Sequence, residues 1–268
     1  MTGLLRFART DIVRLSTNTA HGFAAQHALV HYPSGAIYSF IPKNACSTLR
    51  YSLALANHCI AGPEDWTWIH ANNGTFTAHL PDLVKAPFSF VIVRCPYARL
   101  ASVFLDKIVD KTPELWQLYR ATRDGFTPDS LTFRDFVTLL ADKDHLHANI
   151  HWRPQVDFLV YERYTHVFAL EDFGRAIDTL ERSIGLSVQD ARKLTNHGTD
   201  AVTLVHSGAF ADMPLSELAQ MKAQGTLPTH ALLYDAPLVQ QVAELYTDDI
   251  AFYAEHMPAD GLTFPITN

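Results

Sequence analysis

A short apolar run, followed at once by an arginine and then by a helical pattern, constrains the fold of this chain most. Residues 88–93 read Phe-Ser-Phe-Val-Ile-Val, which is typical of a strand buried on both faces of a sheet. Pro96 then starts a helical pattern that continues through Leu100 and Phe104 to Ile108. The order strand, turn, helix is the repeating unit of parallel sheets.

The same order of elements occurs twice more. Residues 36–41 are β-prone and apolar, and residues 47–58 carry apolar side chains at helical spacing. Residues 165–170 predict a third strand, followed by a helix over residues 174–183. Repeated strand–helix units predict an α/β fold with a parallel sheet and helical crossovers.

The rest of the chain predicts a last amphipathic helix and two irregular stretches. The helix is expected over residues 238–255. Residues 112–131 and 195–215 have weak periodicity and many Thr, Asp, Gly and Pro residues, and are interpreted as loops or as caps over the sheet. We expect a single domain over residues 1–268.

Composition excludes several classes of protein. The chain is 48% hydrophobic and 18% charged, unlike disordered or collagen-like sequences. Charges interrupt the N-terminal apolar residues, and no run approaches the ~20 apolar residues of a membrane-spanning helix. The three cysteines, Cys46, Cys59 and Cys95, are too few for a disulfide framework. We therefore expect a cytoplasmic protein without a membrane span.

Charge is distributed unevenly along the chain. A net charge of −7 argues against broad nucleic-acid binding. Between Ile12 and Leu105, however, only three of the 28 acidic residues occur, while six arginines and lysines are present. An anionic ligand is expected there. Exclusion of acids from a buried core is the alternative, although it does not explain the retained arginines.

The first of two candidate anion-binding turns lies in residues 41–50. It leaves a predicted strand and enters a helix whose first residues are small and hydroxylated. Backbone N–H groups of that helix start, the ammonium of Lys43 and the hydroxyls of Ser47 and Thr48 are expected to converge on one phosphate. The glycine-rich Walker sequence is absent. An ordinary Ser/Thr-capped helix explains this turn equally well when it is taken alone.

The second turn places Arg94 directly after the strand at residues 88–93. Ligands of open α/β sheets bind at the carboxyl ends of the strands. Ser102 is expected to face the same side from the following helix, so that a guanidinium and a hydroxyl share a second phosphate. Taken alone, a structural pairing of Arg94 with a carboxylate is the simpler interpretation.

Together, the two turns resemble those of a known family, the carbohydrate sulfotransferases related to the chondroitin 4-O- and HNK-1 sulfotransferases (sulfotransferase family 2). The motifs that carry the resemblance are Pro42-Lys43-x-x-Cys46-Ser47-Thr48-x-Arg50, similar to the 5′-phosphosulfate loop, and Arg94-Cys95-Pro96-x-x-Arg99-Leu100-x-Ser102, similar to the 3′-phosphate motif. Cys95 stands where the family usually has aspartate. A later family pattern is matched loosely by His151-Trp152-x-Pro154-Gln155.

The resemblance implies transfer of a sulfuryl group from 3′-phosphoadenosine-5′-phosphosulfate to a hydroxyl of a glycan or glycolipid. No metal is expected, because a sulfuryl group carries less negative charge than a γ-phosphoryl group and needs only lysine and backbone donors. It also implies a three-layer α/β/α fold similar to nucleotide kinases, with a central parallel sheet. Arg94 and Ser102 would hold the 3′-phosphate of the donor. The residues that would surround its 5′-phosphosulfate are Lys43, Asn44, Ala45, Cys46, Ser47, Thr48 and Leu49.

The attacking hydroxyl must lose a proton, and a histidine is the natural general base. Sulfotransferases that resemble this chain often place that histidine between the two turns, where His70 and His79 are the candidates. His70 is favoured because the chain after it leaves room for a helix that returns to the next strand. Two packing or surface histidines, with Glu64 or no side chain as the base, are the alternative.

Other readings of the sequence stay open. His145, His147 and His151 cluster, but their spacing matches no common zinc motif. His151 and Gln155 are expected to line the acceptor cleft or to cap a neighbouring helix. A nucleotide or small-molecule kinase, or a non-catalytic nucleotide-binding protein, would use the same sheet edge.

Overall fold

The computed structural model describes residues 4–8, 13–72, 74–123, 125–191, 194, 202–258 and 260–265. The chain forms two compact units. The sheet unit comprises Met1–Arg94 and Gln155–Asn196, and the helical unit comprises Cys95–Pro154 and His197–Asn268. The single domain expected over residues 1–268 stays a prediction.

The sheet unit is built on a four-stranded sheet. Its strands are β1 (Ala28–His31), β2 (Ala36–Ser39), β3 (Ser89–Val93) and β4 (His166–Ala169), in the order β1-β2-β3-β4. β3 pairs in parallel with both β2 and β4, which confirms the predicted parallel α/β arrangement. β1 is an antiparallel edge strand, so the sheet is mixed.

The antiparallel strand β1 was missed by the sequence patterns. It pairs with β2 through a hairpin turn in which the N–H of Gly35 donates to the His31 carbonyl at 2.8 Å. Gly35 has φ +70, a conformation that favours glycine. The Pro33-Ser34-Gly35 turn between two apolar runs was the available signal.

The register brings the ends of β2 and β3 to one edge of the sheet. Ser39 pairs with Val91, so the two residues after β2 lie level with the end of β3. The chain leaves both strands at their carboxyl ends and then enters a helix in each case. The turns at Lys43 and Arg94 therefore belong to the same sheet edge.

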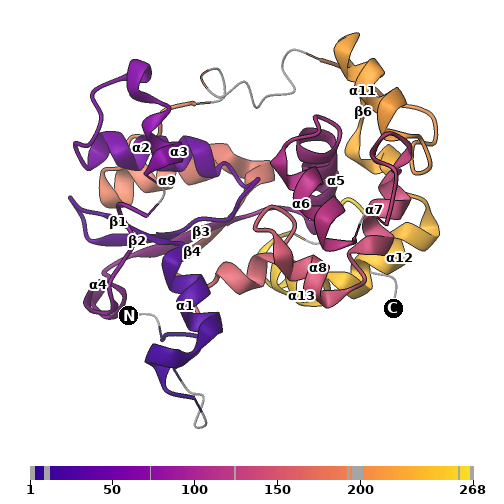
Figure 1. The fold of residues 1–268 in the computed structure, drawn as a ribbon. Helices are drawn as coiled ribbons and strands as arrows, with labels where there is room; N and C mark the ends of the chain where they lie inside the picture. Colours follow the sequence, from indigo (N-terminus) through magenta and orange to yellow (C-terminus); the bar gives the residue numbers. More distant parts are fainter. Residues whose placement is uncertain are drawn as a thin grey trace. The chain divides into compact units, whose positions relative to one another are not determined.

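Helices cover both faces of the sheet (Figure 1). α2 (Cys46–Ala56), α3 (Trp68–Ala71) and α9 (Phe173–Ile184) pack against one face, and α1 (Thr19–Gln26) and α4 (Leu80–Lys85) against the other. The apolar side chains alternate accordingly along the strands, because successive residues of a strand point to opposite faces. The three-layer α/β/α architecture that the resemblance implied is present.

Each face has its own core cluster. Tyr38 and Phe90 stack at 4.9 Å on the face that α2 and α9 cover. Ile37, on the opposite face, packs with Ala24 of α1 and Leu83 of α4. The central strands are thus buried on both faces, as their nearly continuous apolar sequence predicts.

The helical unit contains helices and one small parallel sheet. Its helices are α5 (Pro96–Val103), α6 (Pro113–Ala121), α7 (Phe133–Leu139), α8 (Lys143–Ala148), α11 (Leu215–Ala223), α12 (Ala236–Leu245) and α13 (Thr247–His256). The sheet pairs β5 (Thr203–Val205) with β6 (Thr226–Pro228). α5 continues into a π-helical segment, Phe104–Ile108.

Aromatic side chains form the core of the helical unit. Phe104 packs against Phe133 and Phe136 with ring centroids 5.2 and 5.6 Å apart. Trp152 and Tyr234 extend this cluster by edge contacts with Phe136 and Phe133. Contacts of this geometry contribute beyond the burial of their area.

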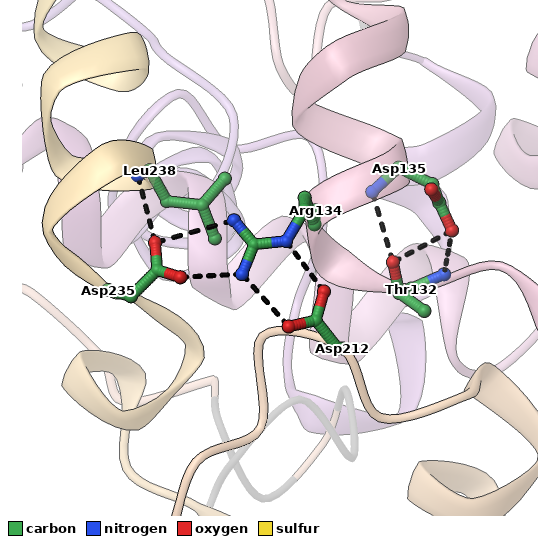
Figure 2. A network of polar contacts seen from close by, with 6 residues as sticks. All are labelled: Thr132, Arg134, Asp135, Asp212, Asp235 and Leu238. Atoms are coloured by element: carbon green, nitrogen blue, oxygen red, sulfur yellow. Dashed lines mark hydrogen bonds and ion pairs between the residues drawn. The ribbon is translucent and has the colours of Figure 1, made fainter.

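An ionic network joins two segments of the helical unit, as Figure 2 shows. Arg134, at the start of α7, donates to Asp212 at 2.6 and 2.9 Å and to Asp235 at 2.5 and 3.4 Å. Asp235 also caps α12 by accepting the N–H of Leu238 at 3.0 Å. Next to it, Thr132 and Asp135 cap α7 reciprocally.

Two predictions about this unit were wrong. The loop expected over 112–131 contains α6, which starts with Pro113 at its first position and buries Leu115 and Leu118. The single helix expected over 238–255 is two helices that separate at Tyr246, whose hydroxyl donates to the Trp152 carbonyl at 2.6 Å. Of the loop expected over 195–215, residues 195–201 lie outside the described residues.

Within the described ranges, none of the helices combines the length and the apolar character needed to cross a bilayer.

Candidate functional site

The first turn has an unusual backbone conformation. Lys43 and Ala45 have φ values of +71 and +56, which are uncommon for residues other than glycine. α2 starts directly after them, and its first helical hydrogen bond runs from the Leu49 N–H to the Ala45 carbonyl at 3.0 Å. The N–H groups of the preceding residues of α2 have no partner at i−4 within the helix. Such N–H groups suit an anion, and the binding of a phosphate at this helix end stays a prediction.

Through its side chain, Asn44 joins this turn to β3 and to Gln155. Its side chain is fully buried, and Nδ2 donates to the Ile92 carbonyl at 2.9 Å and to Gln155 Oε1 at 2.6 Å. Asn44 Oδ1 is buried and has no hydrogen-bond partner among the described residues. Asn44 was predicted to surround the donor, and the structure directs its amide into the protein instead.

Arg94 lies beside this turn. Its guanidinium Nη1 donates to the Lys43 carbonyl at 3.2 Å. Its main chain is held by Gln155, whose Oε1 accepts the Arg94 N–H at 3.0 Å and whose Nε2 donates to the Arg94 carbonyl at 2.9 Å. The structure thus brings Lys43 and Arg94, predicted for opposite ends of the donor, to neighbouring positions on one sheet edge.

The surroundings of the first turn favour an anion. The sequence has no Asp or Glu between Val13 and Pro63. Arg50, one turn further along α2, is buried, donates to the Ile69 carbonyl and lies 5.4 Å from the centre of the Phe40 ring. Burial lowers the pKa of Arg50 from its usual value, and it raises that of the nearby Tyr38 well above its own.

The remaining residues of the turn differ in accessibility. Thr48 and Leu49 are buried, whereas Lys43, Ala45, Cys46 and Ser47 are partly exposed. The partly exposed residues are the ones that solvent reaches at the start of α2. Of the predicted donor-binding residues in this turn, Thr48 and Leu49 therefore offer their backbone more readily than their side chains.

The two candidate bases lie on different parts of the sheet unit. His70 is exposed in the last turn of α3, next to the Ile69 carbonyl that Arg50 binds, and its ring packs edge-on against Trp66 at 5.6 Å. His79 is exposed directly before α4, which covers the opposite face of the sheet, and its N–H donates to Asp82 at 2.8 Å. Only His70 shares a face with α2.

The other residues of the second motif belong to the helical unit. Ser102 is partly exposed on α5, and its role at the 3′-phosphate stays a prediction. Arg99 is buried and donates to the carbonyls of Arg153 and Ile150 at 2.9 and 3.3 Å. Cys95, where the resembling family usually has aspartate, is buried, and its Sγ lies 3.3 Å from the Thr263 N–H that donates to it.

The histidines after α7 serve local structure. His145 and His147 bond the carbonyls of Leu139 and Lys143 through Nδ1 at 3.0 and 2.8 Å. Nδ1 of His151 lies 2.9 Å from Asn149 Oδ1 and 3.4 Å from Glu114. In the part of the chain that the structure describes, no group of three or more His, Cys, Asp or Glu is arranged to hold a metal ion.

Glu114 is the most perturbed acid near these histidines. Burial opposes its ionised form, but hydrogen bonds, first from Thr112 at 2.5 Å, and the neighbouring His151 and Lys107 hold the pKa of its carboxyl below the usual value. Whether His151 contacts an acceptor stays a prediction.

Gln155 is the residue of the candidate site whose contacts the sequence patterns did not predict. It was expected in an acceptor cleft or at a helix end, but its side chain is 3% exposed and joins the two turns. No local pattern predicts a bond between positions 111 residues apart.

Comparisons with known proteins relate the sequence of this chain to sulfotransferases. A sequence model of the Sulfotransferase family matches residues 26–254. Carbohydrate sulfotransferase 14 from Danio rerio is 31% identical over 151 residues, which cover 48% of this chain and 40% of the relative. The chain therefore matches less than half the length of this curated relative. No solved structure gives a significant match.

Proposed function

Because the chain belongs to the Sulfotransferase family, we propose that it transfers a sulfuryl group from 3′-phosphoadenosine-5′-phosphosulfate to a hydroxyl of a carbohydrate. The observation that carries the proposal is the pair of turns at the carboxyl ends of β2 and β3. The turns are neighbours, because the Arg94 guanidinium Nη1 donates to the Lys43 carbonyl oxygen at 3.2 Å. A nucleotide with anionic groups at both its 3′ and 5′ positions needs two such cationic turns on one sheet edge.

The residues present fit this donor. The start of α2 offers backbone N–H groups, Lys43 offers an ammonium and Ser47 a partly exposed hydroxyl, which together suit the 5′-phosphosulfate. Arg94 offers a guanidinium fork for the 3′-phosphate. Ser102 is proposed as its second contact.

Transfer forms a bond between the acceptor oxygen and sulfur while the bond from sulfur to the 5′-phosphate oxygen breaks. Lys43 stabilises the charge that develops on this leaving oxygen, and the N–H groups of α2 orient the group that moves. By analogy with phosphoryl transfer, the transition state is loose and in line, so positioning contributes more than covalent chemistry.

A base must accept the proton of the attacking hydroxyl, and we propose His70 for this role. The placement of α3 on the same face of the sheet as α2 supports this choice, as does the bond from Arg50 to the Ile69 carbonyl directly before His70. His79 precedes a helix of the opposite face. It is the alternative base.

The acceptor and the compartment are the least constrained parts of the proposal. The name of the Danio rerio relative supports a carbohydrate acceptor, and a glycan or glycolipid precursor has the required hydroxyl. The cysteines Cys46, Cys59 and Cys95 are not joined in disulfide bonds, which suits the reducing cytoplasm. Fractionation of cells, followed by immunodetection of the chain, tests the compartment.

Donor selection tests the proposed function directly. The purified protein is incubated with labelled 3′-phosphoadenosine-5′-phosphosulfate or with labelled ATP and a glycan extract, and the products are analysed by mass spectrometry. We expect a mass increase of one sulfate from the first donor only. Phosphate transfer from ATP, or no product from either donor, contradicts the proposal, and the second result favours a non-catalytic nucleotide-binding protein.

A further inference from the structure

We propose that Asn44 and Gln155 are positioning residues whose buried amides fix the separation of the two anion-binding turns before the donor arrives, and so set the preference for a nucleotide phosphorylated at both ends. This inference rests on the proposed function, because it assigns the 3′-phosphate to Arg94.

Gln155 fixes the second turn by binding the main chain of Arg94 on both sides. Its Oε1 accepts the Arg94 N–H, and its Nε2 donates to the Arg94 carbonyl, at 3.0 and 2.9 Å. A side-chain amide that makes both bonds to one residue imitates a neighbouring strand. Arg94 therefore cannot shift along the sheet edge without breaking two partly buried hydrogen bonds.

Asn44 fixes the first turn to β3 and to the side chain of Gln155. Its Nδ2 donates to the Ile92 carbonyl of β3 and to Gln155 Oε1, at 2.9 and 2.6 Å. Both neighbours are acceptors, so a reversed amide would place oxygen against oxygen. The orientation of Asn44 is thereby determined by its partners and not by solvent.

The backbone conformation on either side of Asn44 shows why the first turn needs these hydrogen bonds. Lys43 and Ala45 both have left-handed φ values, which persist only where the surroundings over-determine them. Asn44 lies between them and is completely buried. Its two donated bonds hold the strained turn in the conformation that presents the start of α2.

The geometry gives these amides a role in selectivity. A donor that reaches both turns gains from both only if their separation matches the ligand in the free protein, because any adjustment on binding costs affinity. The affinity for a nucleotide that contacts only one turn does not depend on the separation of the two turns. Loosening the amide pair should therefore weaken binding of a doubly phosphorylated nucleotide selectively.

The test compares binding of adenosine 3′,5′-bisphosphate and adenosine 5′-monophosphate by calorimetry for the wild-type chain, Gln155→Leu, Asn44→Asp and the double variant. Gln155→Glu keeps an acceptor for Asn44 and for the Arg94 N–H but loses the donor to the Arg94 carbonyl. Circular dichroism and thermal unfolding establish which variants fold.

Asn57→Leu is the matched control. Asn57 also uses its amide to join two segments of the sheet unit, accepting the Tyr32 N–H and donating to the Val30 carbonyl at 2.8 and 2.9 Å. It lies at the opposite end of α2 from the turn. Its loss should lower the unfolding temperature without changing nucleotide selectivity.

We expect Gln155→Leu to reduce affinity for the bisphosphate by about tenfold or more, with affinity for the monophosphate changed less than about threefold, because the first turn keeps the bond from Asn44 to the Ile92 carbonyl. Asn44→Asp places a carboxylate in the first turn, so it should weaken binding of both nucleotides, and that of the bisphosphate by the larger factor. The double variant should lose little more than either single variant, because both amides act as one unit. The affinity of Gln155→Glu for the bisphosphate should lie between those of the wild type and Gln155→Leu. This variant provides the test if Gln155→Leu does not fold.

Each other outcome overturns a defined statement. Folded variants that keep the wild-type preference, or an equal change in Asn57→Leu, overturn the positioning role and leave the proposed function standing. A wild-type chain that binds the two nucleotides equally overturns the proposed function, and with it the inference that rests on it.

Discussion

Lys43 is the residue whose replacement separates catalysis from donor binding most clearly. We expect Lys43→Ala to lower kcat by about 10²–10³-fold with a smaller change in the donor KM, because the ammonium meets charge that develops only as the bond from sulfur to oxygen breaks. Steady-state kinetics with varied donor concentration measure both constants.

Lys85→Ala is the control for this substitution, since Lys85 is exposed at the end of α4. It should leave both constants unchanged. A change in KM alone for Lys43→Ala would reduce Lys43 to a donor-docking residue.

His70 carries the prediction about the general base. His70→Ala should lower kcat by about 10²–10⁴-fold while calorimetric donor affinity stays nearly constant, because a base acts in the chemical step and not in nucleotide binding. The affinity is measured with adenosine 3′,5′-bisphosphate.

The comparison variant is His79→Ala, which should keep its turnover. If His79→Ala loses turnover and His70→Ala keeps it, the base is His79. If both variants keep turnover, the histidine mechanism is wrong.

At the scale of elements, the ionic network of Arg134 should support the contact between α7 and the start of α12 at pH values above the usual carboxyl pKa of 3.8, and should lose this effect in acid. Hydrogen bonds from Arg134 hold the pKa of Asp212 and Asp235 below their usual 3.8. Carboxyl groups with a depressed folded pKa stabilise the protein above the unfolded pKa and lose this effect as the pH falls through the folded value.

Arg134→Gln should therefore lower the free energy of unfolding by about 1 kcal/mol at pH 7, a small effect because the pairs are largely exposed, and by less at pH 3. Urea unfolding at both pH values measures the difference. Arg120→Gln, an exposed arginine on α6, is the control and should have no effect at either pH. An effect of Arg134→Gln that is equal at the two pH values would show that the carboxylates do not cause it.

Local patterns predicted the elements that position the site, but not the contacts between them. The strands at Ser89–Val93 and Ala36–Ser39 and the helices after them follow from apolar runs that end at charged or proline-containing turns. The break at Tyr246 depends on a hydrogen bond to the Trp152 carbonyl, 94 residues away in the sequence. The contacts of Gln155 likewise join residues far apart in the sequence, such as Arg94, 61 residues away. Hydrogen bonds between such distant residues produce no repeating pattern in the local sequence, so they could not be predicted from it.

For the whole molecule, acid should destabilise the sheet unit. Burial lowers the pKa of His21, His31 and His166 below 6.5. The unfolded chain then binds more protons than the folded chain between the folded values and 6.5, so the free energy of unfolding falls as the pH decreases through this range. The unfolding temperature should drop measurably between pH 7.5 and about pH 5, where free histidine becomes protonated.

His166→Phe tests this origin of acid sensitivity. The ring of His166 stacks between Phe88 and Phe168 at 5.1 and 5.3 Å, and its Nδ1 is buried with no partner among the described residues. A phenylalanine keeps the stacking and cannot be protonated, so the variant should lose less stability at low pH than the wild type. His147→Gln, an exposed site on α8, should follow the wild-type curve; a parallel curve for His166→Phe would assign the acid sensitivity elsewhere.

The order of the strands along the chain has a consequence for biosynthesis. β3 is complete at Val93, but its partner β4 begins at His166, and the ribosome must first make the intervening residues. At ~5–20 residues per second, this interval lasts roughly 4–14 seconds. During that time one edge of β3 has no strand beside it, and Phe90 and Ile92 lack the cover of α9. The nascent chain therefore presents an open, apolar strand edge, and chaperones that bind such edges are expected to raise the yield of folded protein.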